Sequence, residues 1–287
     1  MAIPKGLEPT GVILFDKPAG PSSFAVLAGV RSRTRAKTGH AGTLDPFATG
    51  LLILLSGRAT TMASCFVGLP KRYLTDVDLS RRTSTGDPEG EPLEAHDIPT
   101  RSSLDAALEG LRGEIELPIP TASAVKIGGE RAYKLHRQGV VVEMPLRRSQ
   151  VDALDVIAYT EGIATLDLRV SSGTYVRSIA DALGGHCVSL RRTEVGPFSV
   201  EEADAERVLT LDEALGRIGM TVAEAEAERR QKADADRRAH EARQASEAGG
   251  ADASDASDAV GASEAHGTDA TAEAARAAAG QSGEADG

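Results

Sequence analysis

The apolar and polar positions of this chain follow two patterns, continuous apolar runs and strict alternation, and both are typical of β-strands. The apolar runs at residues 11–15 and 51–55 predict buried strands. Residues 73–79 and 163–170 alternate apolar with polar positions, which predicts strands with one face in the core. At least four strands are therefore expected in the first 170 residues.

Apolar residues at helical spacing predict three helices, at residues 24–30, 104–111 and 175–183. Either Ser22 or Ser23 can cap the first of these helices. Strands and helices follow one another without the regular spacing of β-α-β units. This order predicts an α+β domain.

The last 67 residues, 221–287, differ sharply from the rest of the chain. Their only large apolar side chains are Val222 and Val260, and they hold 15 acidic and seven basic residues, so most of the net charge of −11 lies here. Such a segment cannot bury enough apolar surface to offset its ordering entropy. We expect a folded domain at 1–220, followed by a polar tail without an apolar stripe, helical to about residue 245 and then disordered.

The composition excludes several classes of protein. Two cysteines, Cys65 and Cys187, cannot build a disulfide framework, and no Cys/His cluster has the spacing of a zinc site. The longest apolar run, at 51–55, is too short to cross a bilayer, and the first residues do not resemble a signal peptide. We expect a reduced, cytoplasmic protein with no membrane segment and no metal.

The most unusual stretch is residues 38–50, where three glycines, a proline, His40 and Asp45 lie between a basic segment and a buried strand. A permissive backbone on a rigid scaffold is a common place for catalytic groups. On local chemistry alone, the Asp45-Pro46 pair is also an ordinary turn. The glycines do not match a nucleotide-triphosphate loop, and the chain has no G-x-S-x-G element of a serine hydrolase.

Basic residues recur in short clusters, for example at 31–37, 126–137 and 191–192. If folding brings such clusters to one side, a nearly neutral domain can present a phosphate-binding face despite the acidic tail.

Six motifs, in order, resemble those of the bacterial tRNA pseudouridine-55 synthase family. They are GVILFDKPxGxSS at 11–23, GHxGTLDPxATG at 39–50, KRY at 71–73, SAVK at 123–126, GTYVRSI at 173–179 and LRRT at 190–193. The resemblance spans roughly residues 11–200. It implies a pseudouridine-synthase-like fold, with a mixed, mostly antiparallel central sheet flanked by helices and loops, and a catalytic domain within 1–220.

The resemblance implies that the enzyme isomerises one uridine in the T-loop of tRNA, at position 55. The N1–C1′ bond breaks, the uracil turns, and C5 bonds to C1′. No redox cofactor or metal is needed, because atoms and electrons balance within the substrate. Asp45 carries over as the catalytic carboxylate, which acts either as a nucleophile at C1′ or as a base at the sugar. Arg177 carries over as the partner that keeps Asp45 ionised, by opposing the effect of burial.

Further residues carry over as binding groups for a base flipped out of the T-loop. Tyr73 is expected to stack on the uracil and to help remove the C5 proton, while Tyr175 and Leu190 form pocket walls. Core packing remains the alternative for these three residues. His40 is expected to enter the T-loop where the base was, and Lys17 to support the active-site loop or a phosphate.

Two other functions stay open, a tRNA-binding or tRNA-folding protein with little catalysis and a pseudouridine synthase for another RNA. We expect the T-arm of tRNA as partner and a monomeric enzyme. The chain departs from the family pattern in its polar tail, where relatives carry a small RNA-binding domain, and in Ala122, where many relatives have a bulkier residue.

Overall fold

The computed structural model describes residues 10–251 of the chain. Contacts between residues divide the chain into a compact unit that ends at Ala233 and a second unit, Asp234–Gly287. The described part of the second unit belongs to helix α7, Val222–Ala251. The disorder expected toward the C-terminus concerns mainly residues 252–287, which lie outside the described residues.

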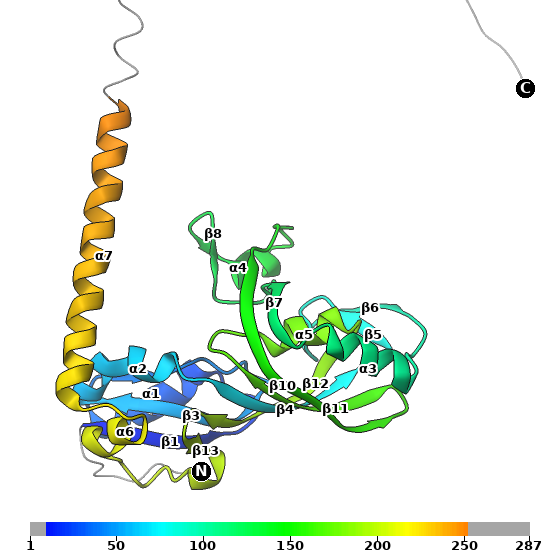
Figure 1. Cartoon of the computed structure of the whole chain (residues 1–287), viewed down its shortest axis with the longest axis horizontal. Coiled ribbons are helices and arrows are strands. Elements are labelled where there is room, and N and C mark those ends of the chain that lie inside the picture. The colour runs from blue at the N-terminus through cyan, green and yellow to red at the C-terminus, as the bar shows by residue number, and fades with distance from the viewer. Residues whose placement is uncertain (1–9, 252–287) are drawn as a thin grey trace, which may run out of the picture. The chain divides into compact units, whose positions relative to one another are not determined.

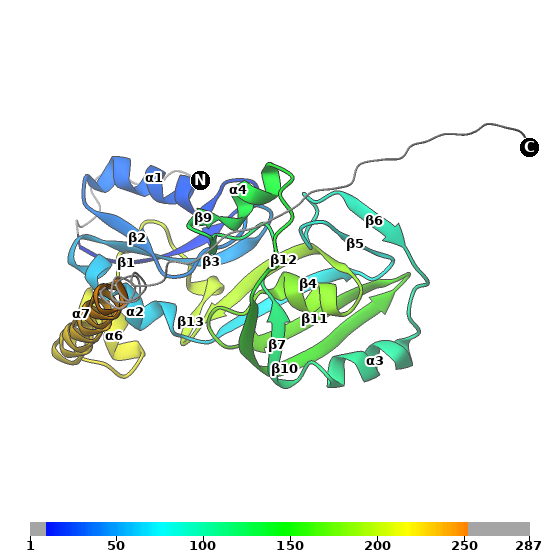
Figure 2. The same cartoon turned by 90° about the horizontal axis from the view of Figure 1, so that it is seen from above.

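A mostly antiparallel sheet forms the centre of the compact unit (Figures 1 and 2). Its strand order is β1-β3-β12-β4-β11-β10-β7, with β2 on β3 and β13 on β12, and only β12 and β3 pair in parallel. The expected α+β fold with this kind of sheet is confirmed. The strands are β1 (Gly11–Lys17), β2 (Thr38–His40), β3 (Thr49–Ser56), β4 (Lys71–Asp78), β7 (Gly113–Pro118), β10 (Leu146–Thr160), β11 (Ile163–Val170), β12 (His186–Val195) and β13 (Phe198–Ser199).

The apolar runs become strands that are buried on both faces. In β3, Leu52 and Leu54 enter one apolar cluster, whereas Leu51, Ile53 and Leu55 enter a second cluster on the other face. All five side chains are fully buried. Strand β3 is therefore a rigid support for the loop that precedes it.

The alternating segments bury one face, as expected. In β4 every second residue is buried, and the same period continues through β11, its neighbour. Short helices pack around the sheet, and in both views α3 and α5 lie near β7 and β10 (Figures 1 and 2). They are α1 (Ser23–Thr34), α2 (Ala63–Val67), α3 (Arg101–Glu109), α5 (Val176–Ala182) and α6 (Leu211–Arg217).

The N-cap of α1 is Ser22, whose hydroxyl accepts a hydrogen bond from the backbone N–H of Ala25 at 3.1 Å. This cap satisfies one of the free N–H groups of the first helical turn. It selects Ser22 over Ser23 as the capping residue.

An arm, residues 120–145, projects from the sheet in Figure 1. It contains β8 (Lys126–Ile127), β9 (Glu130–Arg131) and α4 (Ala132–Arg137). The helix ends in three basic residues within its last turn. The arm thus presents positive charge away from the core.

Several strands were not predicted from the pattern. Strand β10 has 15 residues, but most of its side chains are exposed, so no apolar period marks it. The segment 80–92, which has the composition of a turn, contributes to a small separate hairpin of β5 (Arg81–Thr83) and β6 (Pro92–Ala95). Short or exposed strands gain their stability from hydrogen-bonded neighbours, which the local sequence does not show.

The start of α7 packs on the folded unit, although the sequence shows no apolar stripe there. Ala225 is fully buried, Val222 packs on the second apolar cluster, and Glu226 forms a 3.0 Å ion pair with Arg58. Two small apolar side chains and one ion pair are therefore enough to hold the start of α7 on the folded unit. In the described residues, no helix combines the length and apolarity that a membrane crossing requires.

Gly50 is predicted to be essential for folding, because β3 and β12 approach each other there. Its φ is +102°, and a β-carbon at this position would overlap the carbonyl oxygen of Arg192 and lie 2.7 Å from its nitrogen. Gly50→Ala should lower the free energy of unfolding by about 3 kcal/mol or more, measured by urea denaturation.

The matched control is Gly29→Ala, in the exposed part of α1. A β-carbon at Gly29 meets no atom within 4 Å, and its φ lies outside the left-handed region. Because alanine favours helix, this variant should be unchanged or more stable by up to about 1 kcal/mol. Equal stability of the two variants would contradict the close approach at Gly50.

Candidate active site

The loop that carries Asp45, residues 41–48, is held to the start of α1. The hydroxyl of Ser23 donates to the carbonyl of Leu44 and accepts from its N–H, both at 2.8 Å. Ser23 is itself buried. The Asp45 loop therefore has a defined position, although its backbone is not part of the sheet.

Lys17 also holds this loop, through hydrogen bonds to its backbone carbonyls. Its Nζ donates hydrogen bonds to the carbonyls of Pro18, Pro46 and Ala48, at 3.0, 3.1 and 2.6 Å. Burial lowers the pKa of Lys17 to about 8, although the nearby charge of Asp45 raises it. Of the two roles expected for Lys17, this geometry favours support of the loop over contact with a phosphate.

Asp45 and Arg177 form a two-pronged ion pair. Nε of Arg177 lies 3.0 Å from Oδ2 of Asp45, and Nη2 lies 3.2 Å from Oδ1. The arginine side chain is 2% exposed, whereas that of Asp45 is 32% exposed. The guanidinium thus fixes the carboxylate from the protein side and leaves it open to solvent.

Three further groups hold Arg177, and they come from different parts of the chain. Nη1 donates to the carbonyl of Thr85 at 2.8 Å and lies 3.1 Å from a carboxylate oxygen of Asp87. Nη2 donates to the carbonyl of Ala122 at 3.1 Å, at the foot of the arm. This last contact uses the backbone, so it does not depend on a bulky side chain at position 122. Arg177 therefore joins the Asp45 loop, the 80–92 segment and the arm.

Asp87 is a site residue that the sequence reasoning missed. It is buried, and it accepts hydrogen bonds from the Thr85 hydroxyl at 2.6 Å and the Glu89 N–H at 3.1 Å. In the sequence, Asp87-Pro88 has the appearance of a turn, and nothing nearby indicates that it faces Arg177. Only the pairing of distant segments identifies it.

The ionisation of Asp45 reflects a balance of opposing effects. Burial raises the pKa of Asp45 above its ordinary value of 3.8, and the charge of Asp87 raises it further. Arg177 and Lys17 lower this pKa but do not cancel the effect of burial. The expected opposition by Arg177 is therefore present, yet the carboxyl remains harder to ionise than an exposed one.

Tyr73 and Leu190 are buried in one apolar cluster. The same cluster contains Leu44 and Ala48, which come before and after Asp45 in the sequence. The side chains of Tyr73 and Leu190 are 8% and 6% exposed. Both residues thus share a packed environment with the Asp45 loop. This packing is compatible with a wall of a binding site and with the alternative of core packing.

Tyr175 is half-buried at the start of α5, two residues before Arg177. Burial raises its pKa, while the charges of Arg147 and Arg177 lower it and that of Asp45 raises it. Tyr175 is thus within electrostatic reach of both members of the ion pair.

His40 ends β2, and its Nδ1 is buried without a hydrogen-bond partner in the described residues. Burial, followed by the charge of Arg192, lowers the pKa of His40. Both effects favour the neutral imidazole, which can enter a nucleic-acid loop without a large desolvation penalty.

Together these residues place a partly exposed carboxylate beside a buried guanidinium, with aromatic and apolar side chains nearby. An ionised carboxylate so held can attack an electrophilic carbon or remove a proton. Within residues 10–251, no group of three or more His, Cys, Asp or Glu side chains is arranged to hold a metal ion.

Known proteins resemble this chain over most of its length. Residues 31–176 match the TruB family of pseudouridylate synthases, N-terminal domain. The tRNA pseudouridine synthase B of Mycobacterium tuberculosis strain H37Rv is 41% identical over 245 residues, covering 76% of this chain and 81% of the relative. The enzyme of the same name from Marinomonas sp. is 41% identical over 212 residues, covering 71% of this chain and 67% of the relative.

A solved structure also shares the fold. A chain of a Cbf5–Nop10–Gar1 complex superposes with a TM-score of 0.52 at 28% identity, over 67% of this chain. The present chain spans half the length of that chain. On the match of residues 31–176 and the extent of the sequence identity, the chain belongs to the TruB family of pseudouridylate synthases.

Proposed function

We propose that this protein isomerises uridine to pseudouridine in tRNA, at position 55 of the T-loop, acting as a monomer in the cytoplasm with the tRNA T-arm as its partner. The observation that carries the proposal is the ion pair of Asp45 and Arg177, whose carboxylate is fixed yet open to solvent. The relatives named tRNA pseudouridine synthase B support the substrate class.

The reaction requires the target base to leave the stack, which costs a few kcal/mol. The ionised Asp45 then acts as the N1–C1′ bond breaks, either by bonding to C1′ or by removing a proton from the sugar. The uracil turns, and C5 bonds to C1′ as the bond to Asp45 breaks or as the proton returns to the sugar. C5 then loses its proton, and N1 gains one. Tyr73 is the nearby group proposed to stack on the base and to assist removal of the C5 proton.

The arm and its basic side chains bring the RNA to this site in the proposal. Lys126, Arg131, Lys134 and Arg137 are all exposed on the arm. Phosphate contacts by such residues release counterions, so RNA binding should weaken with salt. A carboxylate fixed by a buried guanidinium favours an enzyme over a protein that only binds tRNA.

The first test replaces the catalytic carboxylate. Asp45→Asn should reduce pseudouridine formation in a T-arm hairpin RNA by at least about 10⁴-fold, because the neutral amide can neither attack C1′ nor accept a proton. The measurement is release of tritium from 5-³H-uridine under single-turnover conditions. RNA affinity, measured by filter binding, should change little.

Asp152→Asn is the matched control, because Asp152 is exposed and lies on β10 away from the ion pair. It should retain full activity. Unchanged turnover in Asp45→Asn would contradict the proposal, and tight RNA binding with no turnover in the wild type would favour the tRNA-binding alternative. Faster turnover on another structured RNA than on tRNA would favour the synthase with a different substrate.

The pH dependence should show the raised pKa of Asp45. Because the ionised form is the active one, the single-turnover rate should rise with pH and level off above the pKa. The midpoint of this rise should lie above 3.8, the ordinary value, since burial raises the pKa. Rates between pH 4 and 8, with folding checked by circular dichroism, would measure it, and a midpoint at or below 3.8 would contradict the effect of burial.

Asp87 should act through Arg177. Asp87→Asn removes one carboxylate from the buried guanidinium, so kcat should fall about 10- to 100-fold with little change in KM. It also removes a charge that raises the pKa of Asp45. The rise of the single-turnover rate with pH, the acid limb of the profile, should therefore move to lower pH. The exposed neighbour Glu89→Gln is the control and should alter neither quantity. A loss of activity with an unmoved acid limb would indicate a purely structural role.

A further inference from the structure

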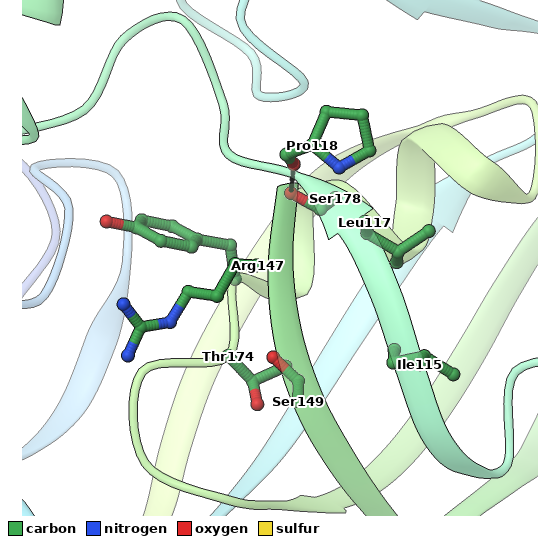
Figure 3. A pocket seen from close by; sticks show the side chains of 8 residues that line it. Ile115, Leu117, Pro118, Arg147, Ser149, Thr174 and Ser178 are labelled. Carbon is green, nitrogen blue, oxygen red and sulfur yellow. Dashed lines mark hydrogen bonds between the residues drawn. The ribbon is translucent and has the colours of Figure 1, made fainter. Parts of the chain in front are cut away.

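Arg147 lies beside a small cavity that the catalytic ion pair does not use. The cavity is shallow and partly open to solvent, and it is lined by residues of β7, β10 and the turn before α5, among them Ile115, Arg147, Thr174 and Tyr175. Figure 3 shows the Arg147 guanidinium on the side of the cavity away from Ile115 and Leu117.

The turn before α5 is shaped to receive this guanidinium. Gly173 has a φ of +82°, and a β-carbon there would overlap Nη2 of Arg147 and lie 2.7 Å from its Cζ. The absence of a side chain at position 173 therefore lets the guanidinium lie against the backbone of the turn. The next residues, Thr174 and Tyr175, also line the cavity.

Among the described residues, Arg147 has neither an ion pair nor a hydrogen bond, whereas its neighbour Arg148 is paired with Glu114 at 3.3 Å. Side chains alternate along a strand, so Arg147 and Arg148 point to opposite faces of β10. Arg147 is thus a positioned cation whose side chain has no partner within residues 10–251. An exposed guanidinium with free donors is well suited to bind a phosphate through two hydrogen bonds.

The cavity is next to the proposed uracil site. Tyr175 lines it and precedes Val176 and Arg177 in α5, and Pro118, also at the cavity, leads into the arm. A nucleotide that places its sugar at Asp45 and its base beside Tyr175 carries a phosphate on each side of that sugar. Arg147 and Tyr175 line the same cavity, and the charges of Arg147 and Asp45 both act on Tyr175, so one of these two phosphates is directed toward Arg147.

We propose that Arg147 binds a backbone phosphate adjoining the flipped uridine, and so fixes the sugar of that nucleotide over Asp45. This inference rests on the proposed function for its substrate. It adds a specific anchor at the reacting nucleotide to the general attraction by exposed basic residues.

The test combines protein variants with altered RNA. Wild type, Arg147→Gln and Arg148→Gln are each tested on three synthetic T-arm hairpins. The first hairpin is native. In the second, a neutral methylphosphonate replaces the phosphate on the 5′ side of the target uridine, and in the third it replaces the phosphate on the 3′ side. Affinity is measured by filter binding and kcat/KM by tritium release. Arg148→Gln is the matched control, since it removes an equal charge from the adjacent, differently facing position.

On native RNA, Arg147→Gln should lower kcat/KM about 10- to 100-fold, as expected for loss of a charge-assisted hydrogen bond, and Arg148→Gln less than about threefold. On one of the two methylphosphonate RNAs, wild type and Arg147→Gln should become equal, and that RNA identifies the phosphate. Arg147→Lys, which keeps the charge but not the fork, should retain an intermediate activity.

Equal effects of Arg147→Gln and Arg148→Gln on native RNA would overturn the inference. So would a loss in Arg147→Gln that is as large on both methylphosphonate RNAs as on native RNA, because Arg147 would then act only on the fold. If the wild type makes no pseudouridine at all, the proposed function fails, while the affinities of the same variants and RNAs still decide whether Arg147 binds a phosphate.

Discussion

The site depends on one buried cation, the guanidinium of Arg177, which is 2% exposed. A charge this deep is stable only where opposite charges and hydrogen-bond acceptors surround it. Here Asp45 and Asp87 supply charge, and the carbonyls of Thr85 and Ala122 supply acceptors. Because these groups come from three separate places in the chain, the need to compensate one arginine also brings together the Asp45 loop, the 80–92 segment and the foot of the arm.

The second constraint is rigidity beneath the Asp45 loop. Strand β3 is buried on both faces, and at Gly50 it approaches β12 too closely for any side chain. Ser23 and Lys17 then bind the backbone of the loop at different residues, Ser23 at Leu44 and Lys17 at Pro46 and Ala48. The loop is irregular, but its position follows from the sheet, which is how a flexible sequence can hold a carboxylate in a defined geometry.

Much of the fold and of the site could be predicted from the sequence. The features that could not be predicted were missed for physical reasons. Strands β3 and β4 have strong apolar patterns because the core selects them. The motifs around Asp45 and Arg177 predict their pairing through resemblance to a family, not through any local rule. Asp87 could not be found, because a buried carboxylate in a turn has the same local sequence as an exposed one. Strand β10 was missed because most of its side chains are exposed, so no apolar period marks it.

The raised pKa of Asp45 shows what the arrangement costs. An acid whose pKa is higher in the folded than in the unfolded state binds more protons when folded, so stability falls as the pH rises through the interval between the two pKa values. Arg177 alone would reduce this cost, but Asp87 shares the guanidinium and raises the same pKa. The fold therefore gives up part of the electrostatic stabilisation of Asp45 to fix the arginine, and leaves a carboxylate that is less well satisfied, and hence more reactive, than an isolated ion pair would provide.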